Sequence, residues 1–181
     1  MHSLMTPLGS GPLSELFRER GCDTLGEASG LLAAIPYGRP TGQGNERVLL
    51  ERRGTCSSKH ALFVSTCREA NVRARLVVGF FLMNEANVPG VGRVLSEAGL
   101  GGIWEAHCVA ELPDGRVDIT GLPSGNRGVD LQGLVDIEPD AIGEKTDLHR
   151  AALRCWAEKE RLPMALDELW VIRERCIAAL G

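Results

Sequence analysis

The stretch Arg53-Gly54-Thr55-Cys56-Ser57-Ser58-Lys59-His60-Ala61-Leu62 decides how the rest of this sequence is interpreted. A helix is predicted from Cys56 to about Ala70, with Thr55 as its N-cap, because apolar residues then recur at helical spacing. This places the Cys56 thiol in the first turn of a largely buried helix. The helix dipole and the free backbone N–H groups of a first turn stabilise a thiolate. Cys56 is therefore the candidate nucleophile.

The other five cysteines carry no comparable signal. No CxxC pair and no regular spacing occurs among the six, so we expect neither a disulfide framework nor a metal knuckle. Cys67 and Cys155 fall in the middle of predicted helices among apolar neighbours, where a thiol is inert packing.

Two predicted strands supply a base and an orienting group. Residues 104–112 alternate, with His107 on the more polar face beside Glu105 and Glu111, which we interpret as solvated. Residues 116–120 form the next strand. With a type I turn over residues 112–115, Asp118 lies opposite Val109 and diagonal to His107, within reach of an imidazole–carboxylate contact. A turn centred one residue later would move Asp118 out of register.

The remaining chain predicts an α+β domain. Helices are expected at residues 13–20 and 24–35, with possible helical structure at 48–50, a buried central strand at 74–83, and amphipathic helices at 147–162 and 164–180. The segment 36–45 is irregular, and residues 84–103 form a long excursion that is either a lid over a cleft or a tolerated insertion. We interpret residues 1–181 as a single domain, with a core at 35–120 and a helical extension at 144–181.

Four runs together resemble the core of the transglutaminase-like superfamily: 53–62 (RGTCSSKHAL), 74–79 (ARLVVG), 104–107 (WEAH) and 114–120 (DGRVDIT). Residues 35–37 (IPY) are similar to the short motif that precedes this core. Such proteins place a cysteine at the start of a core helix and a histidine and an aspartate on adjacent strands, in a fold similar to papain's. The sequence departs from many relatives after His107, where an aromatic residue is commoner, and after Asp118, where Pro-Thr is commoner.

The resemblance implies acyl transfer through a thioester, with an amide of a peptide or small molecule as substrate. Cys56 attacks, His107 moves the proton and Asp118 orients the ring. The oxyanion needs donors, for which the Cys56 backbone N–H is a candidate. Gln43, Asn45 and Tyr37, upstream in the irregular segment, are further oxyanion or substrate-side candidates.

Composition excludes several classes of function. The net charge of −4 gives no reason to expect a nucleic-acid or anionic-membrane partner, and no apolar run is long enough to cross a membrane. The N-terminus lacks the pattern of a secretion signal, so we expect a cytoplasmic protein. No nucleotide-binding fingerprint occurs, and we expect no cofactor.

Alternatives remain open. A binding or scaffold protein that keeps the fold without turnover predicts the same motifs. His60, His107 and Cys108 raise a metal site, but neighbours on a strand point to opposite faces and cannot both reach one ion. Lys59, Arg52 and Arg53 are either solvated or favour the thiolate and an anionic substrate. The apolar stripe of the C-terminal helices docks on the core, or forms a homodimer contact.

Overall fold

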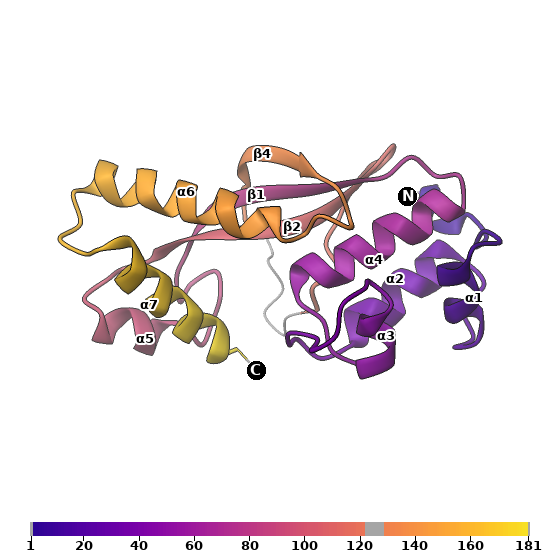
Figure 1. Cartoon of the computed structure of the whole chain (residues 1–181), viewed down its shortest axis with the longest axis horizontal. Coiled ribbons are helices and arrows are strands. Elements are labelled where there is room, and N and C mark those ends of the chain that lie inside the picture. Colours follow the sequence, from indigo (N-terminus) through magenta and orange to yellow (C-terminus); the bar gives the residue numbers. More distant parts are fainter. Residues whose placement is uncertain (1, 122–128, 181) are drawn as a thin grey trace. The chain divides into compact units, whose positions relative to one another are not determined.

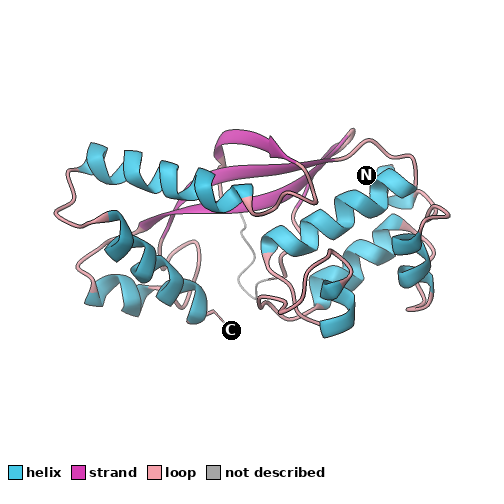
Figure 2. Ribbon diagram, in the orientation of Figure 1, coloured by secondary structure: helices cyan, strands magenta, loops and turns pink. Residues whose placement is uncertain are grey.

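The computed structural model describes residues 2–121 and 129–180, and its fold is α+β as the sequence predicts (Figure 2). Its strands form a four-stranded sheet in the order β3-β2-β1-β4. The elements are, in chain order, η1 (Ser3–Met5), α1 (Pro12–Arg18), α2 (Leu25–Ala34), α3 (Arg47–Glu51), α4 (Cys56–Glu69), β1 (Arg75–Met83), α5 (Gly92–Glu97), β2 (Ile103–Leu112), β3 (Gly115–Val117), β4 (Gln132–Ile137), α6 (Glu144–Glu160) and α7 (Leu166–Ala178).

The described residues divide into two compact units. Unit 1 comprises residues 2–78, 108–121 and 135–142, and unit 2 comprises residues 79–107, 129–134 and 143–180. Strands β1, β2 and β4 each contribute residues to both units. Cys56 and Asp118 belong to unit 1, whereas His107 is the last residue of β2 that belongs to unit 2.

Unit 1 is built around α4, against which α1, α2 and α3 pack (Figure 1). Thr55 caps this helix as predicted, because its hydroxyl accepts the Ser58 N–H while the Ser58 hydroxyl accepts the Thr55 N–H. The helix is buried on nearly every side, and Asn71 after its end takes the left-handed conformation at φ 57°.

The turn between β2 and β3 has the predicted register. Leu112 pairs with Gly115 and Ala110 with Val117 in an antiparallel ladder. The predicted pairing of Asp118 with Val109 lies one residue beyond the last pair of this ladder. The ladder is shorter than predicted, since β3 ends at Val117 and Asp118 follows it.

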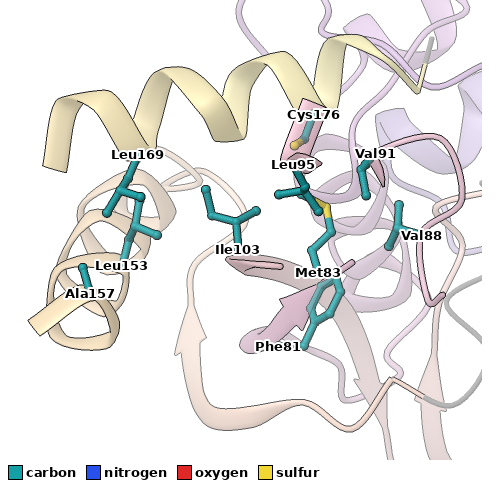
Figure 3. Packing of buried hydrophobic residues seen from close by; sticks show 10 residues of the cluster. All are labelled: Phe81, Met83, Val88, Val91, Leu95, Ile103, Leu153, Ala157, Leu169 and Cys176. Carbon is teal, nitrogen blue, oxygen red and sulfur yellow. The ribbon is translucent and has the colours of Figure 1, made fainter. Parts of the chain in front are cut away.

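Unit 2 has its own apolar core, formed by β1, β2, α5, α6 and α7 (Figure 3). The prediction of an irregular segment at 84–103 is wrong for Gly92–Glu97, which is helix α5, and Val88, Val91 and Leu95 are buried in this core. The apolar stripe of α7 docks here too, with Leu169 fully buried. Strand β4 falls where only a loop was expected, because its residues are mostly exposed and lack an alternating pattern.

None of the helices among the described residues is both long enough and apolar enough to cross a membrane.

Candidate functional site

Cys56 is the first residue of α4, as the sequence predicts. Its side chain is buried, with 5% of its surface exposed, and its Sγ lies 3.9 Å from the Ser57 hydroxyl. The Ser57 hydroxyl is in turn 3.5 Å from Cys108 Sγ on β2. Successive helical residues are about 100° apart, so the Cys56 thiol leaves the helix in a different direction from the side chain that meets Cys108. The thiol therefore stands at the capped, positive end of a long helix, where a thiolate is stabilised.

The chain approaches Cys56 through a close backbone pairing. Tyr37 forms a parallel bridge with Gly54, in which the Gly54 N–H donates to Pro36 and the Gly38 N–H donates to Gly54. A Cβ atom on Gly54 would lie 2.7 Å from the Lys59 side chain, so glycine is required by close packing here. In this bridge Tyr37 lies opposite Gly54, which is two residues before Cys56 in the chain.

His60 is fully buried and ties the first turn of α4 to the segment after β3. Its Nδ1 is 2.6 Å from the Cys56 carbonyl oxygen, and its Nε2 is 2.9 Å from the Ile119 nitrogen. The Ile119 N–H can only donate, so Nε2 accepts and the ring proton is on Nδ1, donated to Cys56. The Asp118 Oδ1, 3.6 Å from Nε2, is therefore not a charged partner of this ring. Sequence reasoning treated His60 as an ordinary helix residue and missed this link.

Lys59 is also fully buried, so the solvated alternative does not hold for it. Its ammonium group donates to the carbonyl oxygens of Ile35, after α2, and Thr120, 2.8 Å away. Burial lowers the pKa of Lys59 to about 8, while Asp118 and Cys56 act in the opposite direction. Lys59 and His60 thus hold one short segment, residues 119–120, against α4.

Asp118 begins that segment, and 32% of its side chain is exposed. Its Oδ1 accepts hydrogen bonds from the Thr120 N–H, at 2.9 Å, and from the Thr120 hydroxyl, at 2.6 Å. These bonds fix the carboxylate in an Asx-type turn immediately beyond the β3 ladder.

His107 is buried on β2, and its ring meets the Phe81 ring edge-on at 6.3 Å between centroids. Glu105, two residues earlier on the same face, is not solvated as predicted. It is buried and receives two hydrogen bonds from Arg173 of α7, each 2.7 Å long. No local sequence pattern indicates this pair, because its members are 68 residues apart.

The other histidines have different surroundings. His149 is buried with Nε2 2.9 Å from the Trp104 carbonyl oxygen, and burial lowers its pKa. His2 is exposed near the N-terminus. Of the other cysteines, Cys67 is buried as predicted, and burial raises its pKa to about 12. The prediction that Cys155 is inert packing is wrong, since it is exposed on α6.

The upstream oxyanion candidates are not alike. Gln43 is exposed. The Asn45 side-chain amide donates to the Ser65 hydroxyl at 3.4 Å and to the Pro139 carbonyl at 3.3 Å. Ser65 lies nine residues along α4 from Cys56, which at 1.5 Å per residue is about 13 Å. The Asn45 amide is therefore directed toward the second half of the helix and away from the thiol.

The part of the chain that the structure describes contains no set of side chains suited to bind a metal ion. Within residues 2–121 and 129–180, no three histidine, cysteine or acidic side chains gather closely enough to hold an ion. A cavity of about 620 Å³ in unit 1 is lined by residues of α2 and α3, by Glu19 and Arg20 after α1, and by Ile35 and Pro36 before the Tyr37–Gly54 pairing.

Comparison with known families agrees with these features. The family model of the transglutaminase-like superfamily matches residues 31–118, just under half of the chain, from the end of α2 to Asp118. The matched segment holds α4 with Cys56 at its start, the Tyr37–Gly54 bridge, β1, β2 and Asp118. Searches of curated proteins and of solved structures gave no match.

Proposed function

We propose that the protein is a cysteine-dependent hydrolase or acyltransferase that acts on an amide of a peptide or small molecule. The observation that carries this proposal is the capped first turn of α4, where Cys56 is the first residue. His60 links the Cys56 carbonyl oxygen to the Ile119 N–H, and Lys59 bonds the Thr120 carbonyl, so this turn is tied to the residues that follow Asp118. Structural packing alone would not require a thiol at this position. The match to the transglutaminase-like superfamily supports thioester chemistry at this thiol.

In the proposed reaction, the Cys56 thiolate attacks the carbonyl carbon of the amide. The tetrahedral oxyanion accepts a hydrogen bond from a backbone N–H of the first turn, and the C–N bond then breaks. The leaving amine takes its proton from His107, which gained it from the thiol, and a thioester remains. Water or a second amine attacks the thioester, His107 accepts the proton of that nucleophile, and the thiol is restored as the carboxylic acid or new amide leaves.

His107 is proposed as the base because it lies on β2, within the segment that the family model matches. Both nitrogens of His60 are committed to backbone groups, and Nε2 of His149 is bonded to a strand carbonyl. His2 is on the exposed N-terminal segment. The register of β2 and β3 supports Asp118 as the group that orients His107. Tyr37 is retained as a candidate substrate-side residue. Asn45 is no longer proposed as an oxyanion donor, because its side-chain amide bonds Ser65 and Pro139.

The low exposure of Cys56 favours one second candidate, a binding or scaffold protein without turnover. The two are separated by alkylation with iodoacetamide, read at each cysteine by mass spectrometry in a Cys155→Ser background. The enzyme proposal expects Cys56 to react well ahead of the buried thiols. His107→Ala should slow this reaction at least about tenfold, within the usual range for a positioned base, and His2→Ala is the matched control that should leave it unchanged. Uniform labelling, or equal effects of the two substitutions, would support the binding protein.

A further inference from the structure

Lys59 is an unusual lysine because its whole side chain is buried without a carboxylate in ion-pair contact, as far as the described residues show. An ammonium group removed from water is costly unless polar groups replace its hydration. Two backbone carbonyls do so here, from Ile35 and Thr120. A leucine or methionine would fill the same space more cheaply, so the charge itself needs an explanation.

The surroundings of Lys59 supply one. The titratable groups that act on it are the Asp118 carboxylate, beyond β3, and the Cys56 thiol, on its own helix. The adjacent His60 carries no net charge when its proton is on Nδ1. From α3, the apolar Val48 lies close to Gly54 beside the Lys59 side chain. The ammonium group therefore has one fixed anion and one thiol that can become an anion within its field.

We propose that Lys59 is a positioning residue that stabilises the Cys56 thiolate by its charge and holds the Asp118–Thr120 segment by its hydrogen bonds. This inference rests on the proposed function for its biological meaning, but the coupling between the two side chains can be measured without any substrate. With a pKa of about 8, Lys59 is protonated in about ten of eleven molecules at pH 7. The stabilising charge is thus present at neutral pH and is lost as the pH rises above 8.

The first arm of the test measures the apparent pKa of Cys56 from the pH dependence of its alkylation, in the Cys155→Ser background. Lys59→Met removes the charge and the hydrogen bonds, whereas Lys59→Gln removes the charge and keeps a donor. We expect both to raise the apparent pKa of Cys56 by about one unit, a tenfold loss of thiolate, as for the removal of a nearby opposite charge. Arg53→Gln is the matched control, because it removes an exposed charge near the same turn that solvent screens.

The second arm leaves Lys59 in place and covers the case in which its variants do not fold. The pKa of Lys59 is followed by ¹³C NMR of its Cε with and without the substitution Cys56→Ser. Coupling between two sites is reciprocal, so the pKa of Lys59 should fall by about the amount that Lys59→Met raises that of Cys56.

An unchanged pKa of Lys59 in the Cys56→Ser variant would overturn the inference. So would a Lys59→Gln variant whose Cys56 titrates as in the parent protein, since only geometry would then matter. Failure of the proposed function looks different: His107→Ala would leave Cys56 alkylation unchanged while the coupling to Lys59 persisted.

Discussion

The ion pair between Glu105 and Arg173 makes a sharp prediction about stability. Only 6% and 8% of the two side chains are exposed, and the guanidinium group meets the carboxylate through two hydrogen bonds. Arg173→Met would leave a buried carboxylate without its partner, which costs about 3–5 kcal/mol. For a chain of this length the midpoint of thermal unfolding should fall by about 10 °C.

A matched control lies two residues further along α7. Arg175 forms an ion pair with Glu97, but 51% of the Arg175 side chain is exposed. Arg175→Met should therefore cost less than about 1 kcal/mol. The double variant Glu105→Gln/Arg173→Met has no unpaired charge, so it should be more stable than Arg173→Met alone.

The assay is urea unfolding followed by tryptophan fluorescence. Trp104, Trp156 and Trp170, the three tryptophans of the chain, all belong to unit 2, so fluorescence reports on the unit that holds the ion pair. Circular dichroism in parallel shows whether unit 1 unfolds with it.

The pH dependence distinguishes the electrostatic explanation from lost packing. Burial alone would raise the pKa of Glu105, but Arg173 and His149 outweigh it and the net pKa is lowered. In the parent protein this stabilisation is present above the unfolded value, about 4.3, and is lost as the pH falls through the folded pKa. In Arg173→Met burial dominates, the carboxyl group binds a proton more tightly when folded, and the penalty should shrink on acidification. A penalty equal to that of Arg175→Met, or one independent of pH, would refute this reasoning.

Two further predictions concern a glycine and the cysteines. Gly121→Ala should destabilise the protein by about 3 kcal/mol in urea unfolding, because φ is +71° and the new Cβ would lie 2.0 Å from a backbone oxygen of α2; Gly21→Ala, at φ +79° with open space, is the control and should cost about 1 kcal/mol. An equal cost at both positions would contradict this. In the parent protein Cys155 should react with iodoacetamide at the rate of a free thiol and Cys67 only after unfolding, by mass spectrometry at each site, and a labelled Cys67 in the folded protein would contradict its burial.

The elements of the core could be predicted from sequence because local signals specify them. Thr55 before an apolar periodic run predicts a capped helix at Cys56, and the Leu112–Gly115 turn predicts the register of β2 and β3 as far as the Ala110–Val117 pair, as the structure confirms. These features depend on residues within a few positions of one another.

The surroundings of the site could not be predicted, because they depend on distant partners. Buried Lys59 donates hydrogen bonds to carbonyl groups 24 residues before it and 61 residues after it. Buried Glu105 accepts hydrogen bonds from an arginine 68 residues later. A charged residue with no local partner is ordinarily solvated. The sequence therefore favoured the wrong interpretation for Glu105 and left the two interpretations of Lys59 open. Helix α5 was not predicted, because it is short and its apolar residues, which pack in the core of unit 2, do not form a regular stripe.

The most direct test of the account is the pH dependence of Cys56 alkylation in the Cys155→Ser background, compared with the same protein carrying His107→Ala. The account predicts that Cys56 reacts with an apparent pKa well below the value of about 8.5 for an ordinary thiol, and that His107→Ala raises this apparent pKa. A Cys56 that titrates as an ordinary thiol, or one that stays unreactive until the protein unfolds, would contradict the enzyme proposal and leave the binding protein as the better explanation.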